Sequence, residues 1–303
     1  MLKIPPHIQI LAEERQKLRE HGMFGKADKI REEILRKGYR VADLKNRTVL
    51  SKIPISDHIT PKHSYMVLFG SGEISHSGAR IHEYVFSRME KDNIRVAIIT
   101  TPAGFQPNVK TVYEEIAEFF LVHLKNYHPQ VSIIYANTRK EANNRKILKD
   151  LERSDYIFTG PGSPTYAIKH LRNTLLIKEI KERVKKGASL SLASAATIAF
   201  SRFALPVYEI YKAGAPLSWE EGLNFYARFF EQLTIVPHYN NKEGGTKTDT
   251  SRCFMGRTRF KKLLSLLPPK EKVWGIDEHT AAVIDLATKQ CLVMGKEKVH
   301  VGR

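Results

Sequence analysis

The sequence has few cysteines and no long apolar run. Its 303 residues include two cysteines, Cys253 and Cys291, which cannot form a zinc cluster between them or a disulfide framework. No stretch approaches the roughly 18 consecutive apolar residues of a membrane-spanning helix, and the amino terminus lacks the pattern of a secretory signal. These absences favour a soluble, cytoplasmic protein with no membrane partner.

Acidic residues are outnumbered by basic ones. The 49 Lys and Arg residues against 32 Asp and Glu residues give a net charge of +17, which attracts polyanions through phosphate contacts. Residues 1–63 hold 14 basic and 8 acidic residues, a net of +6, and the remainder holds +11. The composition therefore permits nucleic-acid binding without assigning it to one segment.

The first 50 residues have a helical pattern. Apolar residues recur at helical spacing in two charged segments, and in the second they are Ala27, Ile30 and Ile34. Residues 51–64 contain two prolines and no helical period, which is typical of a linker. We therefore predict a small helical hairpin over residues 1–50, joined by this linker to a larger domain.

From Tyr65 to Arg303 the chain alternates between two patterns. Helix-like segments, such as residues 108–124 and 175–186, lie between short β-branched runs. The runs cover residues 65–69, 94–100, 131–136, 155–160 and 188–192. This alternation predicts an α/β fold, a three-layer αβα sandwich with a mostly parallel sheet. Functional residues are then expected at the carboxyl ends of the strands.

Ser194 follows the run at 188–192 in the sequence Leu192-Ala193-Ser194-Ala195-Ala196. A serine on a sharp turn between a strand and a helix exposes its Oγ, and the helix amino terminus offers N–H groups to an oxyanion. The small neighbours suit a cramped turn. A structural serine in an alanine-rich strand end is the alternative interpretation.

Two further residues suit a catalytic triad with Ser194. His238 follows the apolar run QLTIV and a proline, so it is expected at a strand end, where it would act as the base. Glu209 lies between the two in the chain and would orient the imidazole as the acid. Four other glutamates nearby leave that assignment open: Glu220, Glu221, Glu231 and Glu243.

Two glycine-containing loops are predicted at the same sheet edge. Gly70 and Gly72 follow the first strand, and Gly162 follows the fourth. Neither loop matches a dinucleotide-binding or P-loop pattern. We predict a ligand loop at Gly70 and Gly72, and an oxyanion hole formed by the N–H groups of Gly162 and Ala195.

Two polar segments near the carboxyl terminus allow alternatives. Asn240 and Arg252 lie in a stretch that suits substrate binding, with Arg252 clamping a carboxylate, or that forms an ordinary loop with a helix cap at Thr248 or Asp249. Residues 275–280 hold two acids and an imidazole. A structural turn is favoured there over a metal site, because no second histidine cluster has ligand spacing.

From Tyr65 to Val301 the chain resembles the serine-peptidase family of dipeptidase E and cyanophycinase, which has a class I glutamine-amidotransferase-like fold. The resemblance rests on the GSG loop, GPGSPTYAI, the turn at Ser194, LPVYE, VPHYNN and GIDEHTAAVID. It places the nucleophile at Ser194, the base at His238 and, through LPVYE, the acid at Glu209. Leu192 and Ala196 stand where the family has glycines, and Pro161 interrupts the second loop.

Residues 11–48 resemble the carboxyl-terminal appendage of cysteinyl-tRNA synthetases, in LAEERQKLRE and ADKIREEILRKGYRVAD. This likeness implies tRNA or another RNA as a partner. A plain helical hairpin is the alternative.

These observations lead to one main prediction and two rivals. The main one is a serine hydrolase that cleaves an amide bond in a small or acidic peptide and needs no cofactor and no metal. The rivals are an inactive amidotransferase-like scaffold that binds RNA through the basic arm, and an enzyme of tRNA-linked metabolism. A homodimer is left open.

Overall fold

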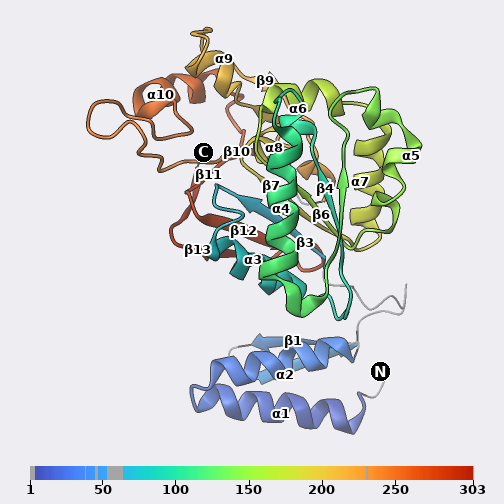
Figure 1. Ribbon diagram of the computed structural model, residues 1–303. Helices are drawn as coiled ribbons and strands as arrows, with labels where there is room; N and C mark the ends of the chain where they lie inside the picture. The colour runs from blue at the N-terminus through green and yellow to red at the C-terminus, as the bar shows by residue number, and fades with distance from the viewer. Residues whose placement is uncertain (1–3, 38, 45–46, 53–63, 230, 303) are drawn as a thin grey trace. The chain divides into compact units, whose positions relative to one another are not determined.

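A computed structural model describes residues 4–37, 39–44, 47–52, 64–229 and 231–302 (Figure 1). The chain forms two compact units, Met1–Lys62 and His63–Arg303. The predicted linker lies mostly outside the described residues. Within the described residues, no helix is both long enough and apolar enough to span a bilayer.

The first unit pairs two helices with a β-hairpin. The helices are α1 (Pro6–Glu20) and α2 (Phe24–Arg36), and the antiparallel strands are β1 (Tyr39–Leu44) and β2 (Arg47–Lys52). The buried core of this unit comprises Ile8, Ala12, Ile34, Tyr39 and Val41. The predicted helical pair is confirmed, whereas both strands were not predicted. Tyr39 and Val41 are buried two residues apart on β1, but a single such pair inside a charged segment is too short to predict a strand.

The second unit contains a seven-stranded sheet in the order β13-β12-β3-β7-β6-β4-β5. The strands from β3 to β5 in this order are parallel, whereas β12 runs antiparallel to both β3 and β13. Their bounds are β3 (Tyr65–Phe69), β4 (Arg95–Ile99), β5 (Gln130–Ile134), β6 (Tyr156–Thr159), β7 (Ser189–Ala193), β12 (Thr280–Asp285) and β13 (Cys291–Gly295). All five predicted runs are strands.

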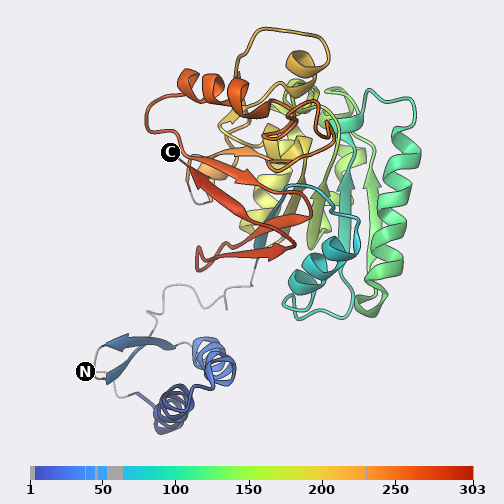
Figure 2. The same ribbon diagram turned by 90° about the vertical axis from the view of Figure 1, so that its left-hand side faces the viewer.

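Helices cover both faces of this sheet, which confirms the αβα prediction (Figure 2). One face packs against α3 (His76–Phe86) and α4 (Val109–His123). The other packs against α6 (Pro164–Leu171), α7 (Leu175–Lys185) and α8 (Ala195–Ala199), and residues of α10 (Gly256–Leu266) belong to the same core. Val67 and Phe69 of β3 enter the first core, while Met66 and Leu68 enter the second, because side chains alternate along a strand.

Shorter elements complete the unit. A small sheet has the order β10-β11-β14, with β10 and β11 parallel. The bounds are α5 (Arg145–Leu148), β8 (Phe203–Ala204), α9 (Val207–Tyr211), β9 (Glu220–Glu221), β10 (Thr234–Val236), β11 (Val273–Ile276) and β14 (Val299–Gly302). The backbone N–H of His238, just after β10, donates to Gly70 O over 3.1 Å, so the small sheet meets the carboxyl end of β3.

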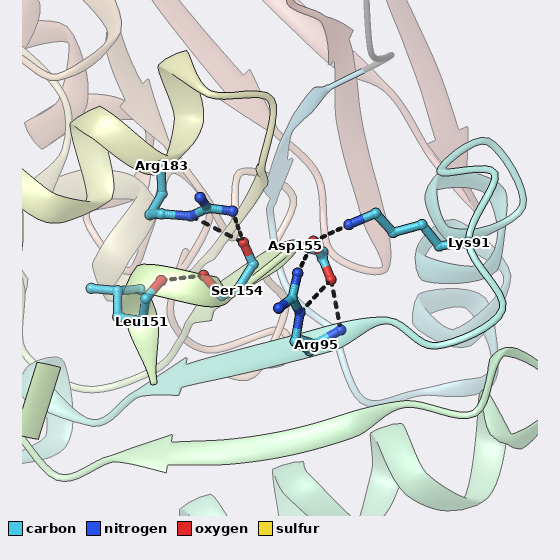
Figure 3. A network of polar contacts seen from close by, with 6 residues as sticks. All are labelled: Lys91, Arg95, Leu151, Ser154, Asp155 and Arg183. Atoms are coloured by element: carbon cyan, nitrogen blue, oxygen red, sulfur yellow. Dashed lines mark hydrogen bonds and ion pairs between the residues drawn. The ribbon is translucent and has the colours of Figure 1, made fainter. Parts of the chain in front are cut away.

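At the start of β6, an ion cluster joins two parallel strands (Figure 3). Asp155 accepts from the Arg95 backbone N–H and Nε, each at 3.1 Å, and from Lys91 Nζ. Beside it, Arg183 Nε donates to Ser154 O at 3.1 Å. Burial alone would raise the pKa of Asp155, but the hydrogen bonds from Arg95 and Lys91 outweigh it and lower that pKa.

We expect Asp155→Asn to lower the free energy of unfolding by about 1–3 kcal/mol at pH 7, because it leaves two cations without their carboxylate. The folded pKa of Asp155 is depressed, so this stabilisation is complete above the unfolded value of about 3.9 and is lost as pH falls through the folded value. Urea unfolding of both proteins at pH 7 and below pH 4 should show the difference shrinking in acid.

The matched control is Glu114→Gln, which removes an exposed helical pair with Lys110. It should change stability by less than about 0.5 kcal/mol. An Asp155→Asn effect as small as that of the control, or one that persists undiminished in acid, would contradict the role of the cluster.

Candidate active site

Ser194 occupies a strained turn between β7 and α8. Its backbone angles are φ 49° and ψ −113°, outside the regions that non-glycine residues prefer. Its Oγ lies 2.9 Å from His238 Nε2. The structure therefore brings the predicted nucleophile and the predicted base together at hydrogen-bond distance, which is the geometry that proton transfer requires.

His238 also has a left-handed backbone, with φ 50°. Its Nδ1 lies 3.0 Å from Glu278 Oε1. A carboxylate only accepts hydrogen bonds, so Nδ1 carries the proton and Nε2 is free to accept from the Ser194 hydroxyl. The imidazole is thereby held in the tautomer that a general base needs.

Glu278 lies in the turn between β11 and β12 and is fixed by two asparagines. Its Oε1 accepts from Asn241 Nδ2 at 2.9 Å, and its backbone N–H donates to Asn240 Oδ1 at 2.8 Å. The hydrogen bond with His238 lowers the pKa of Glu278, against the opposing effect of burial. The side chain is therefore an ionised carboxylate at neutral pH, which can accept the hydrogen bond from His238 Nδ1.

Glu209 is not the acid of this constellation, which corrects the prediction. It lies in the first turn of α9, where its Oε1 accepts from Thr165 Oγ1 at 2.6 Å. Its Oε2 is buried without a hydrogen-bond partner in the described structure. The side chain thus links α9 to the start of α6, and the acid instead follows the histidine in the chain.

The sequence signal for Glu278 is GIDEHTAAVID, which supports the family resemblance and predicts a turn or a metal site but assigns no catalytic residue. Glu278 faces His238, and Asp277 Oδ2 pairs with His300 Nε2 at 2.9 Å. Both acids of this turn therefore pair with imidazole rings, and the turn places Glu278 beside His238.

Gly70 and Gly72 do not line the cavity beside Ser194, which corrects their assignment to a ligand loop. A Cβ on Gly70 would lie 2.1 Å from Asp277 O, and a Cβ on Gly72 would lie 2.4 Å from His279 Nδ1. Both glycines are needed because the turn bearing Glu278 packs directly against them. The two glycines therefore leave room for the turn that contains Glu278.

Gly162 and Ala195 do border a cavity of about 310 Å³ that contains Ser194 and His238. Gly162 has φ 143°, and a Cβ there would lie 2.1 Å from Pro102 O, so only glycine fits. Both residues line the cavity that Ser194 lines, which is the placement that the predicted oxyanion hole needs. Pro161, which precedes Gly162, has not displaced this loop from the site.

Arg252 and Asn240 have structural partners and do not line this cavity. Arg252 Nη1 donates to Tyr239 O at 3.1 Å, and its guanidinium lies 3.9 Å from the centre of the Tyr239 ring. Asp249 Oδ2 accepts from the Arg257 N–H at 2.9 Å, at the start of α10, and this bond lowers the pKa of Asp249 to about 2. Asp249 therefore bonds to the first turn of α10, whereas Met255, the residue before that helix, makes no side-chain cap hydrogen bond. Asn240 and Arg252 line a separate cavity of about 210 Å³, so their role in substrate binding stays a prediction.

The buried side chain of His82 bonds to the loop after β3 and to β6, a contact that the sequence did not predict. His82 Nε2 lies 3.1 Å from Glu73 O, and its Nδ1 lies 2.6 Å from Tyr156 Oη. Burial lowers the pKa of His82 to about 3 and raises that of the Glu73 carboxyl. A neutral imidazole therefore donates to Glu73 O and ties α3 to the loop after β3.

Comparison with known proteins agrees with this geometry. The model of Peptidase family S51 matches residues 66–291. The chain belongs to Peptidase family S51. It is therefore a serine-type peptidase, as predicted, with the predicted fold.

Two solved structures share the fold of this S51 peptidase. A peptidase from an acI-B1 Actinobacterium aligns with a TM-score of 0.62 and 23% identity, over 79% of this chain and 90% of that one. A putative peptidase E protein from Listeria monocytogenes EGD-e aligns with a TM-score of 0.50 and 16% identity, over 78% and 100%. A search of curated proteins found no match. The matched family segment does not include the amino-terminal arm.

The strain at Ser194 predicts an unusual stability effect. Glycine accepts φ 49° and ψ −113° without the steric cost that a Cβ imposes, so Ser194→Gly should be about 1 kcal/mol more stable than Ser194→Ala. Urea unfolding of the two variants measures this difference. The same pair of substitutions at Ser191, a buried residue inside β7, should give the opposite order. Equal stabilities at Ser194 would mean that the turn stores no strain.

Proposed function

We propose that this S51 peptidase cleaves a peptide bond through a Ser194–His238–Glu278 triad. The Ser194 hydroxyl attacks the carbonyl carbon while its proton passes to His238 Nε2. The N–H groups of Gly162 and Ala195 stabilise the resulting oxyanion. The proton then moves from His238 to the leaving amine, and water repeats the sequence on the acyl-enzyme. Glu278 remains ionised and stabilises the imidazolium.

The observation that carries this proposal is the continuous hydrogen-bonded chain from Ser194 Oγ through both ring nitrogens to Glu278. The nucleophile and the base both have left-handed φ angles, and such backbone strain gathers at functional sites. An assembled triad disfavours the inactive-scaffold alternative. The cavity of about 310 Å³ suits a small peptide.

Labelling by a small fluorophosphonate tests the triad. Wild type should be labelled, and Ser194→Ala should not be. Glu278→Gln should slow labelling about 10³–10⁴-fold, because the amide no longer holds the required tautomer of His238. Glu209→Gln is the matched control and should change the rate less than about threefold, since Glu209 contacts Thr165.

Two outcomes of the labelling experiment would contradict the proposed triad. Wild type without labelling would remove the serine-peptidase mechanism. Equal rates for Glu278→Gln and wild type would remove Glu278 as the acid, and a larger loss for Glu209→Gln would assign that role to Glu209.

We further propose that the first unit binds RNA, on the strength of its charge and its independent core. Residues 1–62 have the net charge of +6 noted for this region, and exposed cations project from α1 and α2. The exposed cations include Lys17, Lys26, Lys29 and Arg31. Such side chains contact phosphates without reading sequence.

Deletion of residues 1–62 should weaken tRNA binding about tenfold or more and should flatten its salt dependence, because each lost phosphate contact lowers the slope by about 0.9. Fluorescence anisotropy between 50 and 200 mM salt, roughly the range over which such contacts weaken, measures both. Fluorophosphonate labelling of Ser194 is the control for the fold of the second unit. Unchanged affinity and slope would remove RNA from the partners of this arm.

A further inference from the structure

The cavity beside Ser194 has a wall that catalysis does not require. Four apolar or aromatic side chains outside the triad line it: Ile198, Val207, Tyr211 and Phe254. The Tyr211 and Phe254 rings lie 5.2 Å apart between centroids, and the Phe254 ring lies 5.9 Å from the His238 ring. An apolar group of the substrate that enters this cavity would therefore contact aromatic faces next to the reacting atoms.

The backbone that presents Phe254 is held in a costly conformation. Arg252, Cys253 and Phe254 have φ angles of 59°, 57° and 68°, three successive non-glycine residues in the left-handed region. Hydrogen bonds hold this turn, including one from the Cys253 N–H to His238 O at 3.1 Å. The turn that directs Phe254 into the cavity is thus bonded to the backbone of the catalytic base. Such persistent strain points to a function for the side chain it orients.

The charges at the cavity do not favour an acidic side chain. Lys212 and Glu243 both line it, and both are exposed, so their opposite charges offset one another and are screened by water. Lys212 Nζ lies 5.2 Å from the centre of the Tyr211 ring. The predicted carboxylate clamp, Arg252, packs on Tyr239 outside the cavity.

We propose that this cavity is a specificity pocket for an aromatic or bulky aliphatic side chain next to the scissile bond, with Phe254 and Tyr211 as its selecting residues. The inference rests on the proposed function, since it assumes that Ser194 is the nucleophile. It names a substrate class, namely small peptides with an apolar residue at the cleavage site, in place of acidic peptides.

Boronic acids test the pocket without a known substrate. Ser194 Oγ adds to the vacant orbital of boron and its proton passes to His238, so no group leaves. Each compound is measured by the concentration that halves fluorophosphonate labelling. 2-Phenylethylboronic acid should compete at least about tenfold better than 2-carboxyethylboronic acid, because burying a phenyl group is favourable and burying an unpaired carboxylate is not.

Substitutions in the cavity wall test which residues produce the preference for the phenyl compound. Phe254→Ala and Tyr211→Ala should each reduce the phenyl-over-carboxyl ratio about tenfold, and Phe254→Leu should reduce it less. Phe105→Ala is the matched control, because Phe105 is an exposed aromatic residue that does not line this cavity, and the ratio should stay at the wild-type value. Methylboronic acid, which has no side chain to place, should compete equally in every variant that folds.

The outcomes separate the two proposals. Absent labelling of wild type overturns the proposed function, and the pocket with it. Normal labelling with a ratio near one, or with 2-carboxyethylboronic acid preferred, overturns the pocket alone. A wild-type preference for the phenyl compound that survives Tyr211→Ala, Phe254→Ala and Phe254→Leu also overturns the assignment to these residues.

Discussion

Gly70 is the point where the segments that build the active site meet. It ends β3 at the carboxyl edge of the sheet, its carbonyl accepts the N–H of His238, and its missing Cβ leaves room for Asp277 O. The base and the turn bearing the acid are therefore positioned by the same residue. Any side chain at this position would push the β11–β12 turn away, and Glu278 would move out of reach of His238.

The carboxyl end of the sheet also positions Ser194. β7 lies beside β3 in parallel, so Ser194 emerges next to Gly70, and Thr197 Oγ1 of α8 donates to Phe69 O at 3.3 Å. Leu192, which stands where related elbows have glycine, is fully buried in the core between β7 and the helices. The strained turn therefore forms without that glycine, because the strain is concentrated at Ser194 and the surrounding core holds it.

The fold was predictable because buried strands and helices each give a regular spacing of apolar residues in the sequence. Strands buried on both faces produce the mainly apolar runs at β3, β4 and β6, and the short run SLSLA at β7 is buried throughout although it contains two serines. The pair Ser194 and His238 was predictable for a related reason, since each follows such a run at a strand end. The hairpin of β1 and β2 was not, because short strands in a charged segment carry little periodicity.

The acid escaped prediction because chain order does not determine which carboxylate reaches Nδ1. Glu209 lies between serine and histidine in the chain, but its turn of α9 faces Thr165 on α6. Glu278 lies forty residues after His238 and reaches it because Gly70 and Gly72 seat its turn while Asn240 and Asn241 orient it.

Those contacts connect segments far apart in sequence, so the local pattern GIDEHTAAVID marks the turn without showing which of its side chains reaches His238. In the folded chain, the turn that contains Glu278 requires glycine at positions 70 and 72 and amide side chains at positions 240 and 241. Those four residues therefore identify Glu278 as the carboxylate beside His238, but only once the fold is known.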